Sequence, residues 1–309
     1  ALLILLTLPG YARAAGPVDT AAPVSLTVSC RMGGEALVGV RASLYLAAQM
    51  DETGDLTWIE PVRSFPVQLE GLDAAGWQRA AQVVESYLLS SGAACAATGV
   101  TGPDGTVTLP AAGQTLAPGL YLVSIAPHRQ GGWRYEAEPF FVLLPGRDAE
   151  TDAWVYAGSA APKFRRDPEP APPDTDRREV VKLWADGGDA SSRPEEVKIT
   201  LLCDGAVWDT ASLRAETGWS YAWEKLPAGH RWQVIEAVPD GYSVLTWQDG
   251  QTLYVENTPD TPPAPQPEEP AQPGGRLPQT GQLWWPVPVL LGVGLLLVTA
   301  GLLRRRGHA

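Results

Sequence analysis

The stretch VKITLLCDGAVW, residues 197–208, decides the fold expected for the C-terminal half of the chain. A strand over Val197–Leu202 leads into an Asp204-Gly205 turn, and a second strand begins at Ala206. Further short strands are expected on both sides of this hairpin, at Val180–Trp184, Trp219–Trp223, Trp232–Glu236 and Thr252–Asn257. Strands of this length, separated by turns, predict a β-sandwich over residues 178–259.

Three polar residues interrupt apolar strand faces in this domain. Lys182, Glu236 and Asn257 each alternate with apolar neighbours, so they point to the same side as core residues. Burying one of them alone is costly, and we therefore expect the three to meet. Burial shifts an amine toward its neutral, nucleophilic form and a carboxyl toward its protonated form. The trio predicts attack by Lys182 on the Asn257 carboxamide, catalysed by Glu236, which gives an isopeptide bond. A Lys182–Glu236 salt bridge, with Asn257 only ending a strand, is the alternative.

The order of motifs along this domain resembles the collagen-adhesin B-type (Cna B) domain. The matching features are a K-x-W-x-D opening, R-P before the second strand, a W-S-Y strand, an L-P turn, an E-x-x-P-x-G-Y box and a closing E-N-T. The resemblance implies the same three roles for Lys182, Glu236 and Asn257.

A first domain is expected over residues 24–163. Its predicted strands are Val24–Cys30, Ala36–Leu46, Thr106–Leu109, Gly119–Ile125, Glu138–Leu144 and Trp154–Tyr156. One helix is inserted among them, capped by Asp73 and stopped by Gly92. The expected fold class is therefore all-β, with two immunoglobulin-like, Cna B-like β-sandwich domains in tandem.

The T-G-P-D-G turn and the G-L-Y-L-V strand of this domain resemble the N-terminal domain of SpaA-type pilins. Trp154 followed by Pro162-Lys163 resembles the pilin motif, which implies that Lys163 accepts the threonine of a neighbouring subunit. Ala161 stands where that motif has tyrosine, and an ordinary solvated linker lysine is the alternative.

Two cysteines of the first domain, Cys30 and Cys95, belong to a chain expected to be exported, where a disulfide is chemically permitted. Spacing alone does not derive the pairing, and two separate buried thiols are the alternative.

The C-terminal end carries a sorting pattern. Leu277, Pro278, Gln279, Thr280 and Gly281 spell LPQTG, an apolar run over 283–303 follows, and 304–309 is a basic tail. The run is long enough to cross a bilayer as a helix, with the arginines on the cytoplasmic side. The pentapeptide resembles the sorting signal of Gram-positive surface proteins, which implies cleavage by a sortase after Thr280 and transfer to peptidoglycan or to another pilin subunit.

The remaining segments fit an exported surface protein. Residues 1–14 resemble the remnant of a signal peptide, 164–177 a linker, and 260–276 an extended Pro-rich stalk. A net charge of −12 argues against a nucleic-acid partner. The sequence has no recognisable catalytic constellation of an enzyme, and no cofactor or metal site is expected.

These features predict a pilin or pilin-like structural subunit on the surface of a Gram-positive bacterium, inserted in the membrane before sorting and covalently joined to the cell wall afterwards. A monomeric wall-anchored adhesin that binds a host or matrix ligand through its first domain is the alternative.

Overall fold

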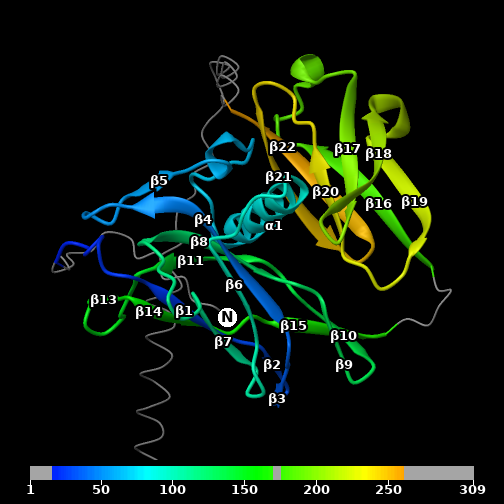
Figure 1. Ribbon diagram of the computed structural model, residues 1–309. Coiled ribbons are helices and arrows are strands. Elements are labelled where there is room, and N and C mark those ends of the chain that lie inside the picture. The colour runs from blue at the N-terminus through cyan, green and yellow to red at the C-terminus, as the bar shows by residue number, and fades with distance from the viewer. Residues whose placement is uncertain (1–15, 170–174, 261–309) are drawn as a thin grey trace, which may run out of the picture. The chain divides into compact units, whose positions relative to one another are not determined.

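The computed structural model describes residues 16–169 and 175–260, and that part of the chain is mostly β-strand with one α-helix (Figure 1). The predicted leader 1–14, sorting signal 277–281, apolar run 283–303 and basic tail 304–309 lie outside the described residues, as does the stalk beyond residue 260. Among the described residues, no helix is both long and apolar enough to cross a membrane.

Fifteen strands form the first domain. They are β1 (Ser25–Ser29), β2 (Arg31–Met32), β3 (Glu35–Ala36), β4 (Arg41–Met50), β5 (Leu56–Trp58), β6 (Ala97–Val100), β7 (Thr106–Leu109), β8 (Gly119–Ile125), β9 (His128–Gln130), β10 (Trp133–Ala137), β11 (Phe140–Leu144), β12 (Gly146–Arg147), β13 (Trp154–Val155), β14 (Ala157–Ala160) and β15 (Phe164–Pro168). The largest sheet has the order β11-β8-β4-β5, and β6 also pairs with β4. Two three-stranded sheets have the orders β14-β1-β7 and β15-β10-β9, and two strand pairs, β2-β3 and β12-β13, complete the domain.

The central strand β8 is buried along its whole length. Tyr121 and Val123 pack into one hydrophobic cluster, with β1, while Leu120 and Leu122 pack into another, with the helix. Because both faces of the sheet are covered, this strand is apolar at nearly every position rather than at every second one. The largest sheet is therefore the middle layer of the first domain.

One helix, α1 (Ala74–Ser90), follows the short 3-10 turn η1 (Val62–Ser64). The Asp73 side chain accepts a hydrogen bond from Gly76 N at 2.7 Å, which caps the first turn. After the last turn, Gly92 adopts a φ of 65°, a conformation that glycine enters without strain. The predicted helix is confirmed, including both of its end signals.

The second domain is a sandwich of two sheets. Its elements are β16 (Thr175–Trp184), η2 (Ala190–Ser192), β17 (Glu196–Cys203), β18 (Ala206–Arg214), η3 (Ala215–Thr217), β19 (Ser220–Pro227), β20 (Trp232–Glu236), β21 (Tyr242–Asp249) and β22 (Thr252–Pro259). One sheet has the order β19-β16-β22-β21 and the other β18-β17-β20. Strands β16 and β22, the first and last of the domain, pair in parallel, while the other pairs are antiparallel.

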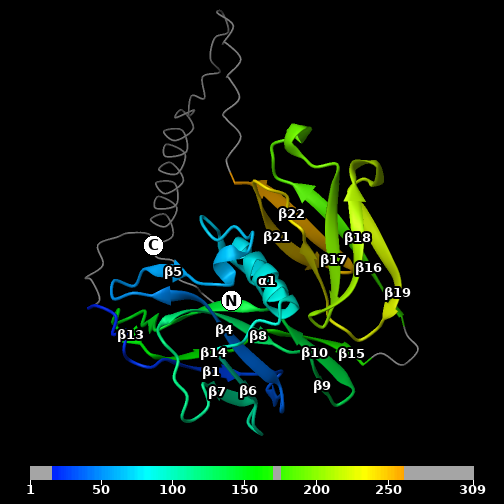
Figure 2. The same ribbon diagram turned by 45° about the horizontal axis from the view of Figure 1, so that its top comes forward.

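The helix of the first domain also packs on the second domain. It contacts β8 and β11 on one side and β20 and β21 on the other, as both views show (Figures 1 and 2). Buried residues from both domains consequently form a single hydrophobic cluster that includes Val84, Leu88, Val234 and Val244. Tandem domains are consistent with the structure, and they share part of their core.

Several boundaries differ from those expected. Residues 164–168, assigned to the 164–177 linker, form β15, which pairs with β10, and β16 already begins at Thr175. The first domain thus extends past residue 163, because β15 pairs its main chain with β10 and Phe164 packs against the hydrophobic cluster that contains β1. The sequence interpretation also missed β21, which completes the sheet beside β22.

We expect Gly105→Ala to lower the free energy of unfolding by more than Gly113→Ala does. Both glycines have positive φ, 75° and 85°, so alanine is strained by about 1–2 kcal/mol at either position. At Gly105 the added methyl would also lie 2.7 Å from the Cys30 carbonyl oxygen, whereas nothing lies within 4 Å at Gly113. Overpacking should cost a further ~1–3 kcal/mol at Gly105.

Urea unfolding of both variants measures the difference. Equal losses would contradict the close packing of the Gly105 turn against Cys30.

Candidate functional site

The predicted trio lies between the two sheets of the second domain. Lys182 on β16 and Asn257 on β22 come from neighbouring parallel strands, in register with Val255 and Trp184 respectively. Glu236, the last residue of β20, comes from the facing sheet. The side chains of Lys182 and Glu236 and the whole of Asn257 are fully buried. The structure therefore brings together the three polar residues that the strand pattern singled out.

One carboxylate oxygen contacts both partners. Glu236 Oε1 lies 3.7 Å from Lys182 Nζ and accepts a hydrogen bond from Asn257 Nδ2 at 3.0 Å. The Lys182 ammonium also donates to the Leu183 carbonyl at 2.9 Å. Glu236 Oε2 and Asn257 Oδ1 are buried without a hydrogen-bond partner among the described residues. The amine and the carboxamide thus share one carboxyl group.

An aromatic wall closes this pocket beside the amine. Lys182 Nζ lies 4.1 Å from the centre of the Trp184 ring, and Trp184 makes edge contacts with Trp219 and Tyr242. The rings exclude water while the ring face attracts a cation. The environment is therefore apolar and confines the amine.

Burial dominates the titration of the pair. Desolvation lowers the pKa of Lys182 to about 8, although the Glu236 charge opposes the change. Desolvation likewise raises the pKa of Glu236 to about 7, against the opposing effects of Lys182 and Asn257. Because the two pKa values lie close together, a proton can pass between the groups at low cost. A neutral amine beside a protonated carboxyl is the form that can attack an amide.

The residues of the pilin-like motif lie elsewhere, in the first domain. Lys163 is exposed between β14 and β15 and makes no contact with the buried trio. Trp154 donates from Nε1 to the Gly16 carbonyl at 2.8 Å, and Arg147 stacks on its ring at 4.6 Å. Pro162 is half-buried next to Lys163. The amine of Lys163 is accessible, and its acceptor role stays a prediction.

The structure has Cys30 and Cys95 as free thiols, which corresponds to the alternative to the disulfide. Cys30 lies in the cluster formed with β1, while Cys95 packs against the cluster that contains α1. Their side chains thus belong to opposite sides of the middle sheet. Burial raises the pKa of the Cys30 thiol to about 11, which keeps it protonated and unreactive.

A third cysteine belongs to a small polar group at the β17–β18 hairpin. Ligand atoms of Cys203, Asp204 and His230 lie within 4.8 Å of one another. The Asp204 carboxylate accepts from Arg231 N at 2.8 Å and contacts His230 Nδ1 at 2.7 Å. These contacts tie the Asp204 turn to the residues just before β20, which explains why the three side chains lie close together.

Sequence reasoning missed two helix residues that reach the second domain. The Tyr87 hydroxyl donates to the Glu236 carbonyl oxygen at 2.8 Å. Glu85 is fully buried and accepts from Arg231 at 2.6 Å and from Gln233 at 3.1 Å. A signal was present, because Glu85 directly follows Val84 and lies one turn after Ala81, among residues expected to be buried.

Residues 178–258 match the Cna protein B-type domain family. The second domain is thus a Cna B-type domain, as the order of its motifs predicted. No curated protein sequence matches the chain.

The chain also matches solved structures, at low identity and with low TM-scores. The shaft pilin SpaA of Lactobacillus rhamnosus GG has 16% identity and a TM-score of 0.26, over 82% of this chain and 98% of that one. The major pilin SpaA of Corynebacterium diphtheriae has 17% identity and a TM-score of 0.28, over 74% and 51%. Two B repeat units of the collagen binding protein of Staphylococcus aureus have 19% identity and a TM-score of 0.24, over 76% and 49%. The chain covers about half the length of the latter two.

We expect Lys182→Met to make stability fall as the pH rises. This variant leaves Glu236 buried without its cation, and the pKa of Glu236 is already raised from 4.5 to about 7 with the cation present. The protonated form is the stable one inside the fold. Stability is therefore complete below about pH 4.5 and is lost as the pH rises through the folded pKa, by up to about 1.4 kcal/mol per pH unit.

Urea unfolding between about pH 4.5 and 8 measures this slope. Lys182→Met/Glu236→Gln, which has no ionisable group in the pocket, is the matched control and should lack it. An equal slope in both variants would show that Glu236 does not titrate as a buried acid.

Proposed function

We propose that this protein is a pilin-like structural subunit of a bacterial surface, whose Cna B-type domain forms an isopeptide bond between Lys182 and Asn257. The observation that carries the proposal is the burial of an amine, a carboxamide and a carboxyl with one shared oxygen between them. A purely structural salt bridge would leave the Asn257 Oδ1 and Glu236 Oε2 atoms buried and unpartnered, which is costly.

The chemistry balances within the pocket. The neutral Lys182 amine adds to the Asn257 carboxamide carbon while protonated Glu236 donates toward the amide oxygen. Glu236 then takes a proton from the former amine nitrogen and delivers it to the departing nitrogen. The carbon–nitrogen bond of the carboxamide breaks, a new amide to Lys182 Nζ forms, and one ammonia leaves. No oxidant or cofactor is needed.

Assembly on the surface is the second part of the proposal, and sequence features support it. The LPQTG pentapeptide at 277–281, the apolar run at 283–303 and the basic tail at 304–309 have the order of a sortase substrate. Thr280 would be transferred to peptidoglycan or to another subunit. The exposed amine of Lys163 is available as the acceptor for the subunit that follows.

The folded protein should weigh one ammonia less than its sequence. Intact-mass measurement of the purified protein checks this, with the cleaved leader taken into account. Lys182→Ala, Asn257→Ala and Glu236→Ala should each restore the missing mass, because they remove the nucleophile, the electrophile and the proton carrier, respectively.

Lys198→Ala is the matched control for Lys182→Ala. Its lysine is exposed on β17, and its loss should leave the ammonia deficit in place. A wild-type mass equal to the sequence mass would refute the isopeptide bond.

Lys163→Arg should abolish polymers and leave folding intact. The guanidinium keeps the charge but stays protonated and is a poor nucleophile. In a host with a pilus sortase, wild-type wall extracts boiled in detergent should give a ladder on immunoblots, and the variant a single wall-linked band.

Lys198→Arg, another exposed lysine, should keep the ladder. A ladder that survives Lys163→Arg would remove the acceptor role from Lys163. A single wall-linked band in the wild type would favour the monomeric adhesin that binds a host or matrix ligand.

A further inference from the structure

The helix of the first domain covers one open side of the Cna B-type sandwich. Strand β20 ends one sheet of that sandwich and β21 ends the other, so the gap between the sheets opens at these two strands. Helix α1 contacts both of them. Glu236, the proposed proton carrier, is the last residue of β20 and therefore lies directly behind the helix.

Tyr87 on this helix hydrogen-bonds to the main chain of Glu236. Ala237 N donates to Lys198 O, and Asp204 N donates to Arg231 O, which fixes the alternation of the antiparallel β17–β20 ladder. In that alternation, the Glu236 carbonyl points away from β17 toward the open edge of the sheet. The Tyr87 hydroxyl meets it there at 2.8 Å. A side chain of the first domain thus takes the place of the missing neighbouring strand.

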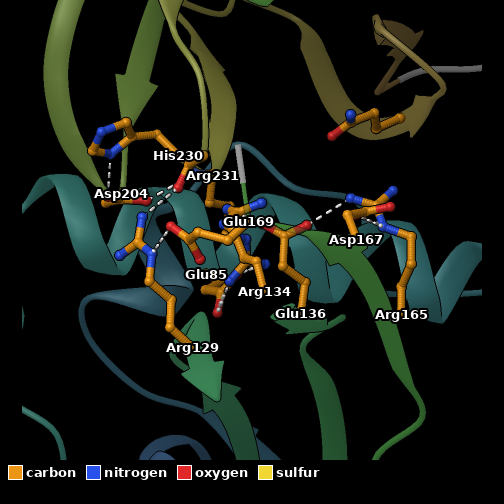
Figure 3. A network of polar contacts seen from close by, with 12 residues as sticks. Glu85, Arg129, Arg134, Glu136, Arg165, Asp167, Glu169, Asp204, His230 and Arg231 are labelled. Atoms are coloured by element: carbon orange, nitrogen blue, oxygen red, sulfur yellow. Dashed lines mark hydrogen bonds and ion pairs between the residues drawn. The ribbon is translucent and has the colours of Figure 1, made fainter. Parts of the chain in front are cut away.

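A buried ion pair keeps the helix on β20. Glu85 accepts from Arg231 at 2.6 and 3.2 Å and from Gln233 at 3.1 Å, as well as from Ser124 of its own domain at 2.5 Å. Figure 3 shows Glu85 and Arg231 within the polar network that also includes the Asp204–His230 contact. Removing one partner of such a pair leaves the other charge buried, so the contact resists separation.

Contacts on β21 add to the same docking. Val244 N donates to the Pro66 carbonyl at 2.8 Å, and Arg79 stacks on the Trp247 ring at 4.0 Å. The helix and the segment before it are therefore fixed on both edge strands. The side chain of Glu236 behind these strands is fully buried.

We infer that Tyr87 is a positioning residue for isopeptide bond formation, and that docking of the first domain completes the reaction site of the second. The inference rests on the proposed bond between Lys182 and Asn257. The hydroxyl fixes the backbone of Glu236 relative to the amine and the carboxamide. The aromatic ring, stacked on Phe65 at 5.1 Å, helps to keep the carboxyl dry.

The full chain made by cell-free synthesis provides the test, because nascent protein is unlinked and loss of ammonia can be followed by intact mass. Tyr87→Phe keeps the ring and removes only the hydroxyl. We expect bond formation to slow by about three- to tenfold, the size expected for one hydrogen bond. Tyr121→Phe is the matched control, because it removes another buried hydroxyl bond of the first domain, to the Ala117 carbonyl, and should form the bond at the wild-type rate.

The pH dependence of the rate separates positioning from a general loss of stability. Lys182 and Tyr87 are the titratable groups against Glu236, and Glu256 and Arg193 lie near Lys182. Without the hydroxyl, water reaches the Glu236 end of β20 and lowers the pKa of its carboxyl. Because that pKa, about 7, lies below the value of about 8 for Lys182, the acid-side break of the rate profile should move to lower pH, while the alkaline-side break, set by Lys182, should stay. A merely destabilised domain would lower the rate equally at every pH.

Glu85→Gln is the second variant, in case Tyr87→Phe does not fold. It weakens docking while Tyr87 remains, and it should also slow the reaction. A linked wild type with unchanged rates and profiles in these variants would overturn the inference alone, as would equal slowing by Tyr121→Phe. A wild type that never loses ammonia would overturn the proposed bond, and the inference with it.

Discussion

Burial of a lysine and a glutamate inside one sandwich is the constraint on which the second domain depends. Burying either charged group without the other would greatly lower the free energy of unfolding. Parallel pairing of β16 with β22 places Lys182 beside Asn257, and the facing strand β20 supplies Glu236. The surrounding Trp184, Trp219 and Tyr242 rings exclude water from the amine. Desolvation is the largest influence on both groups and shifts each toward its neutral form, against the opposing charge of the other.

The need to keep Glu236 buried also involves the first domain. An edge strand with free main-chain groups and a buried carboxyl needs a cover, and α1 provides it from another part of the chain. The shared hydrophobic cluster has a physical consequence, since neither domain can separate without exposing apolar residues such as Leu88 and Val234. The two domains are therefore expected to unfold with some mutual dependence.

Patterns that reflect burial were readable in the sequence. Capping chemistry gave the helix limits at Asp73 and Gly92. A short apolar run gave strand β8, and the Pro103-Asp104-Gly105 turn gave strand β7, which follows that turn. Alternation along the strands gave the trio of Lys182, Glu236 and Asn257. Each of these signals is local or depends on one strand face.

The features that the sequence did not reveal depend on contacts with distant segments of the same chain. Strand β15 is polar and exposed at an edge, so only its pairing with β10 makes it a strand. The helix is apolar on more than one side because it packs between two domains. The apolar periodicity of its sequence does not show which part of the chain covers the second side. Tyr87 was missed for the same reason. Its hydrogen-bond partner is the main-chain carbonyl of Glu236, whose direction is set by the pairing of β17 with β20.

The parallel pairing of β16 and β22 has a mechanical consequence. The chain enters the second domain at the start of β16 and leaves it at the end of β22, which are opposite ends of the paired strands. A pulling force along the chain therefore loads their hydrogen bonds in shear, all together, instead of unzipping them one at a time. With Lys182 joined to Asn257, that force would cross directly from the first strand to the last. The strands between them would carry almost none of the load.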